Sequence, residues 1–229
     1  MKKVLSFIAV GIVAASSAFA QGTVNFAGGT TKVSVAASVG GTASLIAGNT
    51  TATPNYYFAL FYSTSSPTVN GSSSPFSGTQ ASGSYVFETT GQGWTFSQDY
   101  GTNTTANGKF SSSVADVNGI TTVSGLAGGG ASYFTVVGWS SNIGSTVAAL
   151  QSFVDGNSSI TGTGYVGESA VSGLITTGAG LGTPGALFGS APAIPGWTLT
   201  PVSPAPEPAS IALAALGGLS LLGLRRKKA

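Results

Sequence analysis

The segment Asn55-Tyr56-Tyr57-Phe58-Ala59-Leu60-Phe61-Tyr62 is apolar at both its odd and its even positions. Successive side chains of a strand point to opposite faces, so this run predicts a central strand that is buried on both sides. The segment Ser132-Tyr133-Phe134-Thr135-Val136-Val137-Gly138-Trp139 has the same character. It predicts a second central strand.

Shorter β-type runs lie on both sides of these segments, separated by Gly, Asn and Pro clusters that favour tight turns. These predicted strands cover residues 23–26, 32–39, 43–46, 84–88, 108–117, 121–123 and 196–201. One helix is predicted over residues 145–154, after a turn at residues 142–144, because Val147, Leu150 and Val154 recur at helical spacing. We therefore predict an all-β fold, a single β-sandwich with one short helix. Jelly-roll-like connections are one arrangement of such strands.

The composition agrees with this fold class. The chain contains 35 glycines and no cysteine, and only 6% of its 229 residues are charged. Its polarity comes mainly from Ser, Thr, Asn and Gly, which disfavours surface helices and favours strands joined by turns. Residues 63–74 and 176–185 have the composition of flexible linkers. The apolar runs between them favour an ordered domain over disorder.

The formal charge of +2 is a property of the two ends of the chain. Lys2, Lys3 and the C-terminal cluster Arg225-Arg226-Lys227-Lys228 supply six of the eight basic residues. Between residues 21 and 200, Lys32 and Lys109 oppose five carboxylates, so this part carries a charge of −3. It lacks the basic surface that neutralises phosphates, and we expect no nucleic-acid partner.

The residue types also limit the chemistry. The absence of His and Cys excludes an imidazole base, a thiol nucleophile and most zinc sites. A glycosidase needs two carboxyl groups about 5–10 Å apart. Nothing in the sequence pairs the available candidates, which are Glu88, Asp99, Asp116, Asp155 and Glu168. We expect a protein without enzymatic activity, cofactor or metal.

Three weaker patterns have ordinary structural explanations. Asp116-Val117-Asn118-Gly119 resembles the beginning of a calcium loop, but the remaining ligand positions are missing, so we interpret it as a turn. Gly128-Gly129-Gly130 lacks the spacing and the lysine of a phosphate loop and predicts a flexible turn. Trp94, Trp139 and Trp197 could stack on sugars if they were exposed, whereas packing in the core is their usual role.

The N-terminal end has the three regions of a secretory signal peptide. Lys2-Lys3 precedes the apolar run of residues 4–13, and the small residues Ala18 and Ala20 follow it. The apolar run is too short for a membrane helix. We predict export through the Sec machinery, cleavage of residues 1–20 by signal peptidase, and a mature chain that begins at Gln21.

The C-terminal end has the features of a stop signal for a chain that is crossing a membrane. The Pro-rich residues 201–208 form a linker, residues 209–224 are apolar, and Arg225-Arg226-Lys227-Lys228 closes the chain. As a helix, residues 209–224 would extend about 24 Å, short of the roughly 30 Å hydrocarbon core. We predict a marginal, temporary membrane helix with its basic cluster on the cytoplasmic side.

The order Pro206-Glu207-Pro208, short apolar helix and basic cluster resembles the PEP-CTERM sorting signal of exported proteins in Gram-negative bacteria. The resemblance implies that an exosortase-type membrane enzyme recognises Pro206, Glu207 and Pro208. It further implies that this enzyme removes residues 209–229 and releases or attaches the remainder at the cell surface. Members of this family are linked to exopolysaccharide production.

These features predict a β-sandwich body of residues 21–200 with a structural or adhesive role in the exopolysaccharide layer of a biofilm. The protein would be anchored in the membrane transiently and then reach the cell surface or the extracellular matrix. A carbohydrate-binding module is one alternative. A self-assembling fibre protein is another, because residues 56–62 are uncharged, contain no proline and have high β-propensity.

Overall fold

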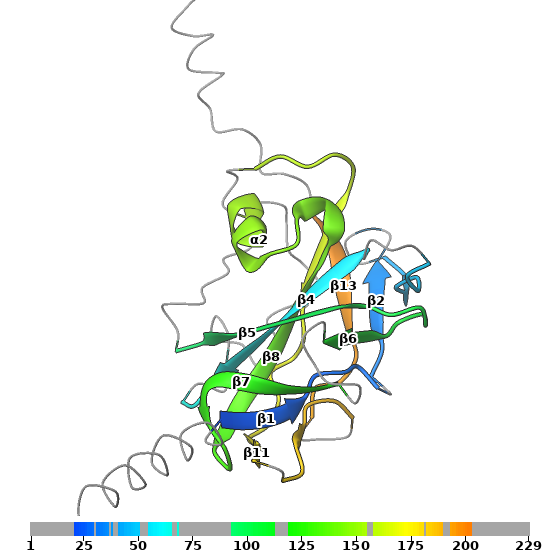
Figure 1. Cartoon of the computed structure of the whole chain (residues 1–229). Helices are drawn as coiled ribbons and strands as arrows, with labels where there is room; N and C mark the ends of the chain where they lie inside the picture. The colour runs from blue at the N-terminus through cyan, green and yellow to red at the C-terminus, as the bar shows by residue number, and fades with distance from the viewer. Residues whose placement is uncertain are drawn as a thin grey trace, which may run out of the picture.

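The computed structural model describes residues 21–29, 31–36, 38, 41–50, 55–65, 68, 93–112, 119–154, 158–180, 182–189 and 193–202. These residues form two curled β-sheets, one short α-helix and one 3-10 turn (Figure 1). The predicted all-β class is confirmed.

The two predicted central strands are neighbours in the larger sheet. β4 (Tyr56–Ser63) pairs antiparallel with β8 (Ala131–Ser140), in a register that runs from Tyr56 opposite Ser140 to Ser63 opposite Tyr133. Every residue of β4 from Phe58 onward is buried. Both faces of β4 are therefore covered, as its uninterrupted apolar sequence predicts.

The larger sheet has the strand order β3-β2-β13-β9-β8-β4-β5-β6, with β10 also paired to β8. Its remaining strands are β2 (Val33–Ala36), β3 (Ala43–Leu45), β5 (Thr95–Asn103), β6 (Phe110–Ser112), β9 (Gly164–Glu168), β10 (Ile175–Thr176) and β13 (Trp197–Val202). The pair β2–β13 is parallel, whereas the other pairs are antiparallel.

The smaller sheet is built around β1 (Gln21–Asn25). This strand pairs with β7 (Ile120–Ala127), β11 (Gly178–Ala179) and β12 (Gly185–Ala186). Beyond β1 the chain reaches the larger sheet, where Gly28 N–H donates to the carbonyl of Phe110 (2.9 Å) and Ser112 N–H donates to that of Phe26 (3.0 Å). These hydrogen bonds join the two sheets at one edge.

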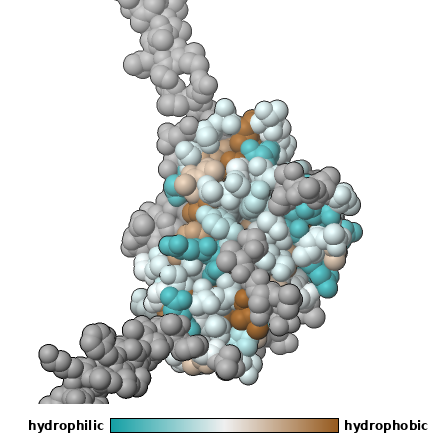
Figure 2. Space-filling view, in the orientation of Figure 1, coloured by the Kyte–Doolittle hydropathy of each residue, from teal (hydrophilic) through white to brown (hydrophobic). Residues whose placement is uncertain are grey.

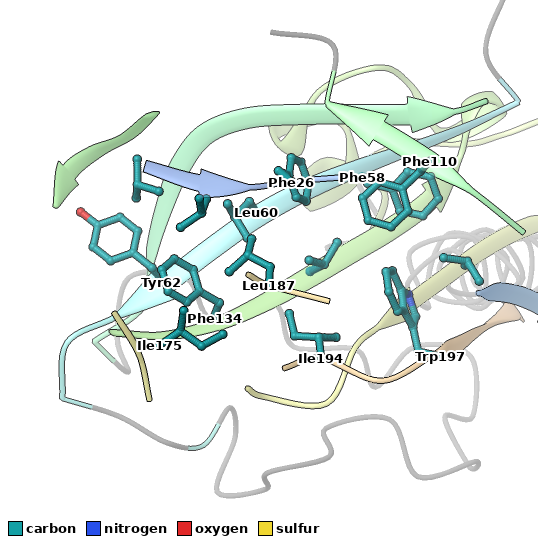
Figure 3. Close-up of a cluster of buried hydrophobic side chains, with 14 of the residues drawn as sticks. Phe26, Phe58, Leu60, Tyr62, Phe110, Phe134, Ile175, Leu187, Ile194 and Trp197 are labelled. Atoms are coloured by element: carbon teal, nitrogen blue, oxygen red, sulfur yellow. The ribbon is translucent and has the colours of Figure 1, made fainter. Parts of the chain in front are cut away.

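Two hydrophobic clusters cover the two faces of the larger sheet. The inter-sheet cluster lies between the sheets and includes Phe26, Phe58, Leu60, Phe110, Val123, Phe134, Trp197 and Leu199 (Figure 3). The helix-side cluster covers the other face and consists of Ala59, Phe61, Trp94, Val137, Trp139, Ile143, Leu150, Phe153, Val166 and Val202. Consecutive β4 residues alternate between the clusters, because strand side chains alternate in direction.

The helix α2 (Val147–Val154) confirms the predicted helix, with a start two residues later. Thr146 forms the N-cap, since its Oγ1 accepts the N–H of Ala149 (3.1 Å). The turn η1 (Ser141–Ile143) precedes it at the predicted position. The hydroxyl of Tyr100 accepts the N–H of Val147 at 3.2 Å and so attaches the first turn of α2 to β5.

Several strands have no counterpart in the prediction. β5 and β9 fall between predicted strands, and β10, β11 and β12 lie in or beside residues 176–185, which have the composition of a linker. β13 also continues to Val202, into the predicted Pro-rich linker. The predicted strand at residues 84–88 lies outside the described residues.

Within the described ranges, no helix has the length and apolar character needed to cross a bilayer. The predicted membrane helix of residues 209–224 lies outside those ranges.

Candidate functional site: the sorting segment and the end of β13

The described body ends in a core strand. The last three residues of β13 pair with β9, with Thr200 opposite Val166, Pro201 opposite Tyr165 and Val202 opposite Gly164. The Thr200 hydroxyl also donates to the carbonyl of Val166 (3.3 Å). Val202 is 9% exposed. The folded part therefore extends at least to Val202.

The end of β13 contributes to the hydrophobic cluster on the helix side of the larger sheet. Val202 belongs to the helix-side cluster together with Leu150 and Phe153 of α2 and Ile143 of η1. Gly164, its cross-strand partner, is close-packed, because a Cβ at this glycine would lie 2.7 Å from Cδ1 of Ile160. The chain thus leaves the body at the end formed by η1 and α2, towards which β13 extends in Figure 1.

The sorting residues follow this strand closely. Three residues, Ser203-Pro204-Ala205, separate Val202 from Pro206. At a maximum of about 3.6 Å per residue, Pro206 lies no more than about 14 Å from Val202. The predicted site residues Pro206, Glu207, Pro208 and Arg225-Arg226-Lys227-Lys228 lie outside the described residues.

At the other terminus, the predicted cleavage residues Ala18 and Ala20 also lie outside the described residues. Gln21 is exposed and is the first residue of β1, where it is paired with Ala127 of β7.

The three tryptophans lie in the core. Trp94, Trp139 and Trp197 are 5%, 0% and 8% exposed. The indole N–H of Trp139 donates to the carbonyl of Gly144 (2.7 Å), and that of Trp94 donates to the carbonyl of Thr68 (2.8 Å). They do not form a sugar-stacking surface, and their interpretation as core residues is confirmed.

Asp99 lies at an irregularity of β5. Tyr100 is opposite Ala59 and Phe96 is opposite Phe61, so β5 contains two extra residues between these pairs. Gln98, within this bulge, has a φ of 69°. Such bulges redirect neighbouring side chains.

The carboxyl group of Asp99 is buried between the sheets. The hydroxyl of Thr121 on β7 donates to its Oδ1 (2.6 Å), whereas its Oδ2 is buried without a hydrogen-bond partner. Burial raises the pKa of Asp99, and the hydrogen bonds to Thr121 and Ser97 oppose this shift.

The two described carboxylates do not form a pair. Asp99 is on β5 and Glu168 is on β9, and two strands, β8 and β4, lie between β5 and β9. At the usual strand spacing, β5 and β9 are therefore about 14 Å apart. Glu168 is opposite Val137 of the helix-side cluster, whereas Asp99 reaches β7 on the inter-sheet side. Glu88, Asp116 and Asp155 lie outside the described residues.

The structure describes one of the two loop motifs, Gly128-Gly129-Gly130, whereas Asp116, Val117 and Asn118 of the other lie outside the described residues. No group of three or more metal-ligating side chains occurs in the part of the chain that the structure describes. Gly128-Gly129-Gly130 forms the turn between β7 and β8, in which Gly130 N–H donates to the carbonyl of Ala127 (3.1 Å). The prediction of a turn at these glycines is confirmed.

The β-sandwich body is thus followed, after three residues beyond Val202, by the Pro206-Glu207-Pro208 segment. The family model of the PEP-CTERM protein-sorting motif matches residues 204–227, so the chain carries this motif at its C-terminus. The motif implies export and membrane-anchored processing, with an exosortase-type enzyme as a partner. Searches of curated proteins and of solved structures found no match to this chain.

Proposed function

We propose that this protein is a structural or adhesive component of the extracellular polysaccharide layer and that its β-sandwich body acts without catalysis. The observation that carries the proposal is the direct continuation of β13 into the PEP-CTERM motif. Because three residues separate Val202 from Pro206, the sandwich is the cargo that the sorting signal delivers.

The surface of the body suits a hydrated polysaccharide environment. The charged residues that the structure describes are Lys32, Lys109, Asp99 and Glu168, and the two carboxylates are buried. Figure 2 shows a face of mostly weakly polar character with small, separate hydrophobic areas. Such a surface offers hydroxyl and amide groups for hydrogen bonds and produces little long-range electrostatic attraction or repulsion.

The arrangement of the carboxylates supports a non-enzymatic body. Acid–base catalysis without histidine or cysteine would rest on paired carboxyl groups. Asp99 and Glu168 lie on opposite faces of the larger sheet, so these two cannot act on one substrate.

The proposed route begins with Sec-dependent export and cleavage after Ala20 by signal peptidase. The body would then start at β1. The helix of residues 209–224 would hold it at the membrane, with Arg225-Arg226-Lys227-Lys228 on the cytoplasmic side, until exosortase-type processing at Pro206-Glu207-Pro208. The remaining protein would enter or join the exopolysaccharide layer at the cell surface.

The structure does not favour the two alternatives. A carbohydrate-binding surface made by the tryptophans is inconsistent with their burial. Fibre formation through residues 56–62 would require β4 to leave its two partner strands, since it is paired to both β5 and β8.

Intact-mass spectrometry of the protein from the native cell surface and medium tests the route. We expect a species that begins at Gln21 and ends near residues 206–208, with any additional mass due to glycans or an anchor. A species that retains residues 209–229 would contradict it. Retention of the protein in the isolated polysaccharide layer, and its loss on enzymatic digestion of that layer, tests the destination.

A further inference from the structure

The folded body ends a few residues before the sorting motif. Proteolytic enzymes act on segments that are free of folded structure, so a rate of cleavage can depend on local opening of the substrate. Here three residues separate Val202 from Pro206. Release of Thr200-Pro201-Val202 from the sandwich would double this spacer.

The contacts of β13 divide the strand into two parts. Residues Trp197 to Leu199 pair with β2, whereas Thr200 to Val202 pair with β9. The pairing with β2 ends at Leu199, so over the final three residues β9 is the strand partner of β13 within the described part of the chain. Pro201 has no N–H to donate, which is tolerated where a strand lacks a partner on one side.

Val202 is the main apolar attachment of this final part. It is 9% exposed and belongs to the helix-side cluster, which also contains residues of α2 and η1. Leu199, three residues earlier, is fully buried in the inter-sheet cluster. Opening from the C-terminal end would therefore expose Val202 while Leu199 stays in the core, which is the pattern of local and not global unfolding.

We propose that Thr200-Pro201-Val202 is a releasable end of β13 that controls access of the membrane-bound processing enzyme to Pro206-Glu207-Pro208. This inference rests on the proposed sorting route. Cleavage proceeds when these three residues separate from β9, and the packing of Val202 sets how often that happens.

A reversible crosslink tests the proposal in the full-length protein in its native host. Pro201 and Tyr165 are cross-strand partners, at a separation that suits a disulfide, and the chain has no cysteine of its own. In the double variant Pro201→Cys, Tyr165→Cys, we expect the rate of loss of residues 209–229 to fall about tenfold when oxidised. A reductant that does not affect processing of the wild-type protein should restore the rate.

Two further variants should increase the rate at which residues 209–229 are lost. Val202→Ala weakens the attachment and should increase processing several-fold, and Val137→Ala is its matched control. Val137 belongs to the same cluster but lies on β8, so the control destabilises the body without loosening the end of β13. A Gly-Ser-Gly-Ser insertion after Val202 should raise the rate and remove the effect of Val202→Ala.

The outcomes separate this inference from the proposed route. If wild-type protein never loses residues 209–229, the sorting route itself fails. If wild-type protein is processed and the oxidised double variant is processed equally fast, the route stands and the releasable end is wrong. Equal acceleration by Val137→Ala and Val202→Ala would also overturn it, because general instability would then explain the rates.

Discussion

The two faces of the larger sheet are covered in different ways. On the inter-sheet face, aromatic rings of the larger sheet meet Phe26, the residue directly after β1, with Phe58 stacked on Phe110 at 4.5 Å and Phe110 against Phe26 at 5.4 Å. On the other face, the cover includes the eight-residue helix α2, and aromatic side chains such as Tyr57 and Tyr133 are only partly buried. One face is closed by a second sheet, and the other in part by a single short helix.

This difference indicates a division of roles. The inter-sheet cluster lies between two hydrogen-bonded sheets. It cannot close around a cavity without moving strands of both sheets. The helix-side cluster can adjust through small movements of α2. Val202, the last described residue, belongs to the cluster on this second side.

Removal of one large ring from each face should show the contrast most strongly. Phe58 is 0% exposed and Phe153, on α2, is 4% exposed. We expect Phe58→Ala to lower the free energy of unfolding by about 4–5 kcal/mol and Phe153→Ala by about 2–3 kcal/mol, because α2 can move inward to fill part of its cavity. Urea denaturation of the purified variants measures both values. Equal losses would contradict a difference in the stiffness of the two faces.

Addition of one methyl group to each face provides a smaller, complementary test. At Gly138 on β8, a new Cβ would lie 2.8 Å from Cε1 of Phe58 and 3.0 Å from Cδ2 of Leu199. At Gly164 on β9, it would lie 2.7 Å from the terminal Cδ1 of Ile160. We expect a loss of about 2 kcal/mol for Gly138→Ala, because the stacked ring of Phe58 cannot move aside.

The matched variant Gly164→Ala should cost about 1 kcal/mol or less, since an isoleucine Cδ1 can change rotamer and Ile160 is only partly buried. The midpoints of thermal unfolding of both variants should follow the same order. The reverse order would show that the helix side is the more tightly packed face.

The central strands and the helix were predictable because their side-chain patterns are strong. β4 and β8 are apolar on both faces, and α2 has apolar residues at helical spacing. β5 has no such pattern, because its inward positions include Ser97, Asp99 and Asn103. These are accommodated by tertiary hydrogen bonds, such as those from the N–H groups of Asn55 and Tyr56 to Oδ1 of Asn103, which no local pattern reveals.

The sorting site was predictable from the order of its features at the C-terminus, whereas its attachment to the body was not. Pro201 and Val202 have the composition of a linker, and proline usually argues against a strand. Their strand conformation depends on pairing with β9 and on the burial of Val202 in the helix-side cluster, which are long-range interactions. The two-residue strands β10, β11 and β12 depend in the same way on partners far along the chain.

Asp99 is the described carboxylate on the inter-sheet side, and its substitution should give the smallest effect. Its pKa is raised by burial, so the folded protein binds this proton more tightly than the unfolded chain does. Its contribution to stability is therefore complete below the ordinary aspartate pKa of about 4 and is lost as the pH rises through the higher pKa of the folded state. Asp99→Asn removes this dependence and keeps an oxygen that can accept from Thr121.

We expect the stability difference, Asp99→Asn minus wild type, to increase with pH above about 4 and to reach about 1 kcal/mol in favour of the variant near neutral pH. Urea denaturation of both proteins at several pH values between about 4 and 7 measures it. Thr121→Val is the matched control: it removes the hydroxyl that stabilises the carboxylate and should steepen the loss of stability with pH. A difference curve that is flat with pH would show that Asp99 ionises in the folded protein as it does in the unfolded chain, and that the inter-sheet side admits water at this bulge.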